Sequence, residues 1–345
     1  MDVTKYIIGK DATIKEALVQ LDNLSDNVLT LFVLDGERMI GTLTDGDIRR
    51  ALISNISLNA SVEQVMNKSF RFICPKEKNV QKIRKIKASG VQLLPCLGEK
   101  EELLRIYNLK TTKSILPIDA VLMAGGKGER LRPLTEKTPK PLLKVGEKAI
   151  IDYNVDNLIN YGVENIHVTT NYLAEQIELH FVDERQGVKI NCVREKEYLG
   201  TIASVKLISD IQNDDVLVMN SDLFTNIDFE DFYQHFRKND ADMSVASIPY
   251  PVNVPYGIFE LEGRNIRGIK EKPTYNYYAN AGIYLIKKSL LDLISAGMYF
   301  NATDFMDLLI SQGKTVIRYP LVGYWIDIGK PVDYQKAQDF VKHIK

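Results

Sequence analysis

The feature that most restricts the fold of this chain is an alternation of short apolar runs with helical stretches across residues 116–345. Strands are expected at residues 118–123, 165–170, 188–193, 215–219 and 242–248. Helices are expected between them, for example at residues 150–161 and 173–181. This alternation predicts an α/β domain with a mainly parallel sheet that helices cover on both faces. Ligands of such sheets bind at the carboxyl ends of the strands.

Residues 1–115 carry a different pattern, in which two related units of roughly 55 residues follow each other. The first unit reads as a helix that begins at Thr13, two strands joined by a tight turn, and a second helix from Asp45. The second unit repeats the helix and the two strands more loosely. Pro117 follows the second unit, so we predict two domains, at residues 1–115 and 116–345.

Composition narrows the class of protein. The chain has 345 residues and a formal net charge of −1, which gives no reason to expect a nucleic-acid partner. No apolar run reaches the roughly 18 residues of a membrane span, and residues 1–5 lack the pattern of a secretory signal. Three scattered cysteines without metal-ligand spacing are typical of a reducing compartment. We therefore expect a cytoplasmic protein with no membrane partner.

A glycine-rich segment, Ala124-Gly125-Gly126-Lys127-Gly128, follows the first expected strand of the second domain. Glycines let backbone N–H groups approach phosphate oxygens closely. The segment is not a P-loop, because the Gly-Lys-Ser/Thr of that motif is missing. It also lacks the third glycine of the dinucleotide fingerprint, since Leu131 stands there. The missing glycine disfavours a nicotinamide-dependent oxidoreductase.

A longer pattern surrounds these glycines. Leu122-x-Ala124-Gly125-Gly126-x-Gly128-x-Arg130-Leu131 is followed by Thr138-Pro139-Lys140-Pro141-Leu142. This pair of motifs resembles the signature of the sugar-1-phosphate nucleotidyltransferase family. The resemblance implies a Rossmann-like three-layer domain that transfers a nucleotidyl group from a nucleoside triphosphate to a sugar 1-phosphate and releases pyrophosphate. It also implies that the nucleotide is bound by Leu122, Ala124, Gly125 and Gly126.

The chemistry of that reaction agrees with the residue types. A phosphate monoester has its second pKa near 6, so the attacking group is already ionised at neutral pH and needs no general base. The difficulty is to bring two polyanions together, which calls for cationic groups. Arg130 offers a two-pronged donor, and Lys140 offers a fixed charge between two prolines. With Lys272, these are the catalytic residues that the resemblance implies, and a surface cation is the alternative for Arg130 and for Lys140.

Two aspartates are candidates for the binding of Mg²⁺, the expected cofactor. Asp222 follows the strand expected at 215–219, and Asp327 lies in the motif Tyr324-Trp325-Ile326-Asp327. The resemblance implies that both hold one Mg²⁺ that bridges the phosphates, and two carboxylates suit that ion. Ser221 departs mildly from the Gly-Asp pair that is usual in the family. Taken singly, each aspartate is also compatible with a strand-end or turn carboxylate.

The segment 195–201 is the candidate for base selection, and the resemblance places Glu195, Gly200 and Thr201 at the nucleotide. Uridylyl and thymidylyl members of the family often carry glutamine at the position of Glu195. A carboxylate only accepts hydrogen bonds, so it suits guanine, whose N1–H and N2–H₂ groups donate. We therefore expect GTP as the nucleotide substrate. A hexose-1-phosphate enzyme that uses UTP or dTTP is the alternative, as is a solvated glutamate without this role.

On the sugar side, the resemblance implies that the sugar 1-phosphate is bound by Gly257, Glu271, Lys272 and Asn280. Glu271 would accept hydrogen bonds from sugar hydroxyls, and Lys272 would pair with the phosphate. The alternatives are a β-turn at Gly257 and a surface ion pair at Glu271 and Lys272.

In the first domain, the segment Gly41–Arg50 resembles the second strand and closing helix of a CBS domain. Residues 1–115 would then form a regulatory CBS pair with an adenine nucleotide as ligand. Threonine hydroxyls and a helix N-terminus suit a phosphate, and the resemblance assigns this role to Thr42, Thr44, Asp45 and Asp47. The alternative is that Thr44 and Asp45 merely cap the helix. The second unit lacks the matching turn. CBS pairs tend to associate, so we expect a homo-oligomer.

With both domains, the chain is similar to the glucosamine-1-phosphate guanylyltransferases of legionaminic acid synthesis and to mannose-1-phosphate guanylyltransferases. The resemblance therefore implies synthesis of a GDP-sugar, with GDP-glucosamine as one candidate. A catalytically inactive CBS nucleotide sensor is the rival class of protein. The presence of Arg130, Lys140, Asp222, Lys272 and Asp327 argues against that rival.

Overall fold

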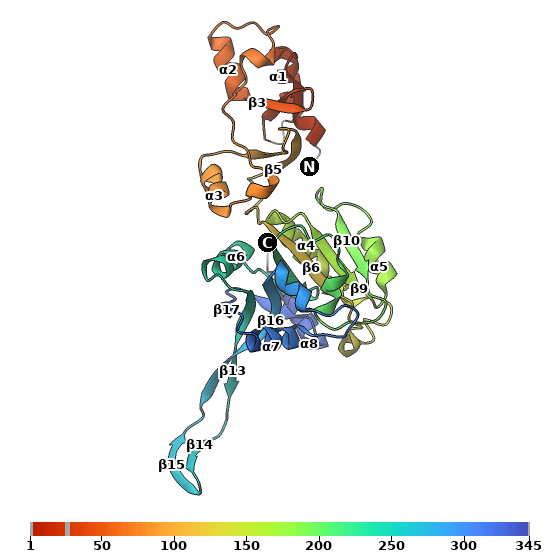
Figure 1. Ribbon diagram of the computed structural model, residues 1–345, viewed down its shortest axis with the longest axis vertical. Helices are drawn as coiled ribbons and strands as arrows, with labels where there is room; N and C mark the ends of the chain where they lie inside the picture. Colours follow the sequence, from red (N-terminus) through yellow and green to blue (C-terminus); the bar gives the residue numbers. More distant parts are fainter. Residues whose placement is uncertain (1–2, 25–27, 344–345) are drawn as a thin grey trace. The chain divides into compact units, whose positions relative to one another are not determined.

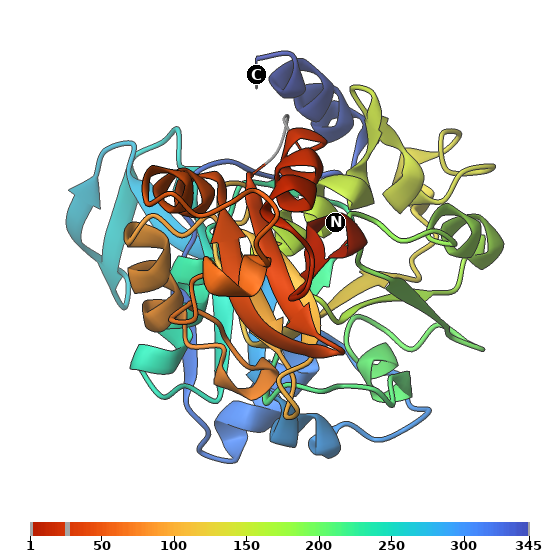
Figure 2. The same ribbon diagram turned by 90° about the horizontal axis from the view of Figure 1, so that it is seen from above.

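Two units make up the chain in the computed structural model, which describes residues 3–24 and 28–343 (Figures 1 and 2). The first unit comprises Met1–Pro117 with the short segments Ile159–Val163 and Arg185–Val188, and the second unit comprises the rest. Residues 1 and 2, which open the segment expected to lack a signal, lie outside the described ranges. Within those ranges, no helix is both long and apolar enough to cross a bilayer.

The first unit contains the predicted order of helix, strand and strand twice. Its elements are η1 (Val3–Tyr6), β1 (Ile7–Gly9), α1 (Ile14–Asp22), β2 (Thr30–Asp35), β3 (Arg38–Thr44), α2 (Asp45–Ile53), η2 (Val62–Gln64), η3 (Pro75–Glu77), α3 (Val80–Ala88), β4 (Leu93–Leu97) and β5 (Leu103–Asn108). β2 pairs in parallel with β1 and antiparallel with β3, while β4 and β5 form a separate antiparallel pair. Residues 109–117 contain no helix equivalent to α2.

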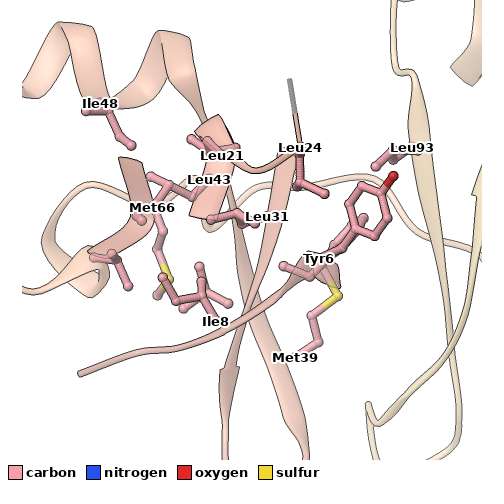
Figure 3. Packing of buried hydrophobic residues seen from close by; sticks show 14 of the residues in the cluster. Tyr6, Ile8, Leu21, Leu24, Leu31, Met39, Leu43, Ile48, Met66 and Leu93 are labelled. Atoms are coloured by element: carbon pink, nitrogen blue, oxygen red, sulfur yellow. The ribbon is translucent and has the colours of Figure 1, made fainter. Parts of the chain in front are cut away.

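The helix α1 begins where the sequence predicts it. The Thr13 hydroxyl accepts the Glu16 N–H at 3.2 Å, and the Glu16 carboxylate accepts the Thr13 N–H at 2.7 Å. Such a capping box stabilises a helix start by about 1 kcal/mol. The buried face of α1 joins the apolar cluster of this unit, in which Leu21, Leu31 and Leu43 lie together (Figure 3).

The second unit is built on a seven-stranded sheet with the order β10-β9-β6-β11-β16-β13-β17. Its strands are β6 (Ile118–Ala124), β9 (Ile166–Thr170), β10 (Ile190–Arg194), β11 (Asp215–Asn220), β13 (Met243–Asn253), β16 (Thr274–Lys287) and β17 (Val316–Pro320). In this sheet, β16 runs antiparallel to both neighbours, and the other neighbouring pairs are parallel. The prediction of a mainly parallel sheet is confirmed, whereas β16 and β17 were not predicted.

Helices and small sheets complete the second unit. The helices are α4 (Ile150–Asn160), α5 (Ala174–His180), α6 (Phe229–Lys238), α7 (Ala302–Ser311) and α8 (Pro331–Val341), with 3₁₀ turns η4 (Glu129–Leu131), η5 (Lys140–Leu142), η6 (Ala203–Leu207) and η7 (Lys288–Leu293). Three antiparallel pairs are β7 (Lys144–Val145) with β8 (Lys148–Ala149), β12 (Leu223–Thr225) with β18 (Trp325–Asp327), and β14 (Ile258–Glu262) with β15 (Asn265–Lys270). The predicted helices at 150–161 and 173–181 agree with α4 and α5 to within one residue at each end.

One apolar cluster holds together the segments that later supply charged groups. Leu131, Phe224 and Ile328, each adjacent or near to a predicted site residue, are buried in the same cluster. The Phe224 ring meets the Tyr153 ring edge-on, with 5.0 Å between the ring centroids. Burial of this cluster therefore fixes the backbone beneath the site.

The distal halves of β13 and β16 leave the sheet as a two-stranded ribbon that ends in β14 and β15 (Figure 1). We call residues 249–279 the arm. The register Ser247↔Asn280 marks its base, and Asn253↔Thr274 is the last pair before β14 and β15.

Candidate active site

The predicted site residues follow strands that end at one edge of the sheet. Gly125 follows β6, Glu195 follows β10, and Asp222 lies two residues beyond β11. The strand order places β6 between β9 and β11. The glycine loop therefore lies between a side that carries Glu195 and a side that carries Asp222, at the edge where parallel sheets bind ligands.

Lys140 and the two aspartates meet on the β11 side. The β12–β18 pair opposes Leu223 to Asp327, and the Ile328 N–H donates to the Asp222 carbonyl at 3.3 Å. The Lys140 ammonium forms an ion pair with Asp222 and lies 3.8 Å from Asp327 Oδ1. Lys140 is only 8% exposed. The buried ammonium group therefore lies against both carboxylates, and its positive charge offsets the repulsion between them.

Arg130 lies beside this cluster. It belongs to η4, which follows Gly128 in the left-handed conformation (φ 62°). A Cβ built on Gly329 would lie 3.1 Å from a guanidinium nitrogen of Arg130 and 3.4 Å from Asp327 Oδ2. The guanidinium and the Asp327 carboxylate are thus neighbours, and the arginine is exposed.

The two carboxylates have the properties of a divalent-cation site. Burial raises the pKa of Asp327 and the Asp222 charge raises it further, while Lys140 and Arg130 lower it. Asp222 Oδ1 is buried and has no hydrogen-bond partner among the described residues. An unpartnered carboxylate oxygen beside a second carboxylate fits a hard cation such as Mg²⁺. Among the described residues, no group of three or more Asp, Glu, His or Cys side chains is placed to hold a metal ion.

Two residues that sequence reasoning missed position Asp222. The Ser221 hydroxyl donates to the Met123 carbonyl at 2.7 Å, which ties the end of β11 to β6. The buried Asn154 amide of α4 donates to the carbonyls of Ser221 at 3.3 Å and Leu223 at 2.8 Å, on either side of Asp222. The signal in the sequence that could have indicated this role is the polar Asn154 among the apolar positions of the helix predicted at residues 150–161. The departure at Ser221 therefore has a structural role.

Glu195 is buried against the glycine loop. Its side chain accepts the Leu199 N–H at 3.0 Å, and the residue is 3% exposed. Burial raises the pKa of Glu195, while hydrogen bonds from Leu199 and Thr169 lower it. A Cβ built on Gly125 would lie 2.6 Å from Glu195 Oε1. The carboxylate is therefore not a solvated strand-end group.

This contact gives a matched pair of predictions. Gly125→Ala is expected to destabilise the protein by about 1–3 kcal/mol, because the new methyl group collides with the Glu195 carboxylate. Gly126→Ala is the control, since a Cβ there meets nothing within 4 Å. Urea unfolding of both variants measures the difference, and equal midpoints would show that Glu195 does not pack against Gly125.

Gly200 and Thr201 tie their loop to the start of α7. Gly200 has a φ of 87°, and a Cβ there would lie 2.6 Å from the Phe300 carbonyl. The Thr201 hydroxyl accepts the Ala302 N–H at 2.9 Å. Tyr198 lies in the same loop, between Glu195 and Gly200. Burial raises the pKa of Tyr198, and the nearby Glu195 and Asp222 contribute to the rise. Two further predicted nucleotide-binding residues, Leu122 and Ala124, are buried in β6.

The predicted sugar-site residues fall in two places. Asn280 lies at the base of the arm, where its side chain accepts the Gly282 N–H at 2.9 Å, and a Cβ on Gly282 would lie 2.5 Å from Asn220 Nδ2. Gly257 and Glu271 lie together on the arm, since a Cβ on Gly257 would lie 2.9 Å from Glu271 Oε2. The neighbouring Lys272 is exposed.

The arm residues are not joined to the aspartate pair of the same chain. Thr274 lies six residues before Asn280 in β16, which corresponds to about 20 Å along an extended strand. Lys272 lies further still from Asn280, beyond Thr274. In the described parts of the chain, no ion pair joins Lys272 to Glu271 or to either aspartate.

The first unit contains a cavity of about 590 Å³ with a mixed polar and apolar lining. Thr42 and Thr44 line it, together with Arg71, Gln92 and Lys110. Asp45 and Asp47 are not among the lining residues. The Asp47 carboxylate accepts the Thr44 N–H at 2.8 Å in a capping box of α2, and Asp45 pairs with Arg49 at 2.8 Å. Helix capping therefore accounts for both Thr44 and Asp47, because the Thr44 hydroxyl accepts the Asp47 N–H at 3.3 Å and donates to the Asp47 carboxylate at 2.6 Å. Thr42 and Thr44 also line the cavity.

The fold and the edge of the sheet define an α/β protein of the nucleotidyltransferase class. Residues 119–343 match the sequence model of the nucleotidyl transferase family, and the chain belongs to this family. It is 33% identical over 223 residues to the mannose-1-phosphate guanyltransferase of Yarrowia lipolytica, covering 62% of this chain and 61% of that protein. It is 29% identical over 225 residues to mannose-1-phosphate guanyltransferase beta-B of Xenopus laevis, covering 62% of each.

The matched region thus spans about 61–62% of the length of these two relatives. Among solved structures, the chain is similar to HddC from Yersinia pseudotuberculosis, with a TM-score of 0.52 and 25% identity. That match covers 65% of this chain and 99% of HddC. Residues 1–118 lie outside the family match, and the assignment of residues 1–115 as a CBS pair stays a prediction.

Proposed function

We propose that this protein is a Mg²⁺-dependent guanylyltransferase that converts GTP and a sugar 1-phosphate into a GDP-sugar and pyrophosphate. The observation that carries the proposal is the meeting of Lys140, Asp222 and Asp327 beside the glycine loop, with Arg130 next to Asp327. The names of two relatives as mannose-1-phosphate guanyltransferases support the same reaction.

In this reaction, an oxygen of the sugar phosphate forms a bond to the α-phosphorus of GTP. The bond from that phosphorus to the bridging oxygen breaks, and pyrophosphate leaves with the electron pair. The nucleophile is ionised at neutral pH, so the protein has to overcome repulsion rather than remove a proton. Arg130 and Lys140 supply the positive charge that faces the phosphates.

The aspartate pair would hold the metal. Asp222 and Asp327 would bind Mg²⁺, which when bound neutralises phosphate charge during the transfer. The unpartnered Oδ1 of Asp222 supports this role. Lys140 keeps the two carboxylates together before the metal and substrates arrive, because its ammonium group offsets their mutual repulsion.

The reaction is tested by pyrophosphate release from the purified full chain. GTP, UTP, dTTP and ATP are each paired with mannose 1-phosphate and with glucosamine 1-phosphate. Fastest release with GTP supports the proposal, and preference for glucosamine 1-phosphate would favour the product expected from the likeness to legionaminic acid enzymes. Fastest release with UTP or dTTP would replace the guanylyl assignment. No release with any pair would favour an inactive nucleotide sensor.

Glu195→Gln is expected to move nucleotide preference from GTP toward UTP or dTTP, because an amide both donates and accepts hydrogen bonds. Stability provides a second measurement. The folded-state pKa of Glu195 is raised by burial, so its contribution to the free energy of unfolding is present below about pH 4.3 and is lost as pH rises through the folded pKa. The free energy of unfolding of Glu195→Gln should not show this decrease with rising pH. An unchanged ratio of kcat/KM for GTP over UTP would remove Glu195 from base selection.

We also propose that the first unit binds an adenine nucleotide in the cavity between its two repeats. Thr42, Arg71 and Lys110 line the cavity, and a hydroxyl with two cations suits a ribose phosphate. The hydroxyl of Thr44, which also lines the cavity, is bound to Asp47. Titration calorimetry of the full chain with AMP and ATP is expected to show binding that Lys110→Ala weakens about tenfold or more. The exposed Lys100→Ala is the matched control. No heat with either nucleotide would overturn the proposed ligand site of the first unit.

A further inference from the structure

The arm has an apolar face that the described chain leaves uncovered. In β14 and β15, Phe259 opposes Ile269 and Leu261 opposes Ile266, so these four side chains share one face. They are 56–64% exposed. The other face carries the ion pair of Glu260 and Lys270. A two-stranded ribbon with one apolar and one polar face has the pattern of a sheet that packs on a partner.

Exposed aromatic side chains continue along β13 and β16 on both faces, since Tyr278, which opposes Pro249 on the other face, is 60% exposed. Tyr250 opposes Tyr277 and Val252 opposes Tyr275, and these side chains are 36–58% exposed. A ribbon of two strands is marginally stable in water on its own. The eight apolar side chains expose roughly 800 Å², which is the area that each partner contributes to a standard protein interface. The arm is therefore large enough to support a stable dimer contact.

The arm also carries groups that the site of its own chain lacks. On the proposed function, on which this inference rests, Glu271 and Lys272 bind the sugar 1-phosphate. They lie beyond Thr274, which is about 20 Å along β16 from the base of the arm. Lys272 is held at a left-handed φ of 43° at an exposed turn, a conformation that is uncommon for lysine.

The aspartate pair is partly accessible from outside the chain. The side chains of Asp222 and Asp327 are 20% and 40% exposed. Lys140 and the neighbouring Arg130 supply cations on the GTP side, and in the described residues Lys272 contacts none of them. A second copy of the chain carries both the missing lysine and an apolar face of sufficient area.

We propose that this protein assembles with the arm of one copy packed on another copy, so that Glu271 and Lys272 complete the sugar-phosphate site of the neighbour. The apolar face of the arm is buried in this contact. Closed homo-oligomers are symmetric, so each copy both gives and receives an arm.

Mixing two inactive variants tests the exchange of arms. Asp222→Asn removes a metal ligand but keeps the arm, and Lys272→Ala removes the arm lysine but keeps the aspartate pair. Co-expressed in equal amounts and purified without selection for the mixed species, they are expected to recover about a quarter of wild-type activity, because random assembly gives two intact halves to one site in four. Asp222→Asn mixed with Asp327→Asn is the control and should recover nothing, since both changes lie in the same half.

No recovery, with an active wild type, would mean that each arm serves its own chain, and the proposal would be overturned. Sedimentation keeps this test separate from the reaction itself. The wild type should sediment as an oligomer, and Phe259→Ser with Ile269→Ser should dissociate it, whereas Glu260→Gln on the polar face should not. A monomeric wild type, or an arm variant that sediments as the wild type does, would overturn the arm contact even if pyrophosphate release is observed. If the wild type forms oligomers that depend on the arm but shows no transferase activity, the proposed function is overturned and the arm contact is not.

Discussion

Asp222→Asn is expected to lower kcat by about 10³-fold or more at the Mg²⁺ concentration that saturates the wild type. Asparagine keeps the shape of the side chain but removes the charge from the oxygen that has no protein partner. Asp327 alone then faces the cation. The fold should survive, because Asn154 and Ser221 hold the backbone on both sides of this position.

Pyrophosphate release against Mg²⁺ concentration measures this loss. Calorimetric titration with Mn²⁺ gives a second readout that does not need turnover, and the variant should bind the ion more weakly than the wild type. Asp183→Asn is the matched control, because Asp183 is an exposed carboxylate outside the site. Wild-type kcat in Asp222→Asn would exclude Asp222 as a metal ligand.

Lys140→Ala is expected to lower kcat by about 10²–10³-fold, because the variant lacks a fixed cation facing the phosphates. The change should also alter the pH profile. Lys140 lowers the pKa of Asp327, so its removal raises that pKa and moves the acidic limb of the rate profile to higher pH. A merely structural lysine would not shift the limb in this direction.

The matched control is Lys238→Ala, since Lys238 is exposed at the end of α6. Circular dichroism should show that both variants keep the fold. A normal kcat in Lys140→Ala would remove this lysine from the mechanism, and a lowered kcat with an unmoved acidic limb would separate Lys140 from Asp327.

The elements that could be predicted are those with local causes. The capping box of Thr13 and Glu16 sets the start of α1, and both residues belong to one turn of chain. The strand at 118–124 and the helix at 150–160 have continuous or periodic apolar residues of their own. By contrast, β16 combines an exposed aromatic half with a buried half from Ala281 to Ile286. No single apolar period describes such a strand, so it was not predicted.

The chemistry-bearing side chains of the site could be predicted, but their supports could not. Lys140, Asp222 and Asp327 stand in motifs whose spacing is visible in the sequence. Asn154 supports Asp222 through two backbone carbonyls more than sixty residues away, and a contact to a carbonyl leaves no mark on the partner's residue type. Ser221 likewise binds the carbonyl of Met123. These positioning contacts became visible only with the strands in place.

By itself, the amino-acid sequence determined the order of helices and strands, the glycine loop and the identity of the charged groups, because propensity, capping and motif spacing act over a few residues. The tertiary structure decided which of those groups meet. It joined Lys140 to Asp222 across 82 positions of the chain and left Lys272 on an arm. The physical reason is that strand order and register arise from burial between distant segments, and a local pattern does not contain that pairing.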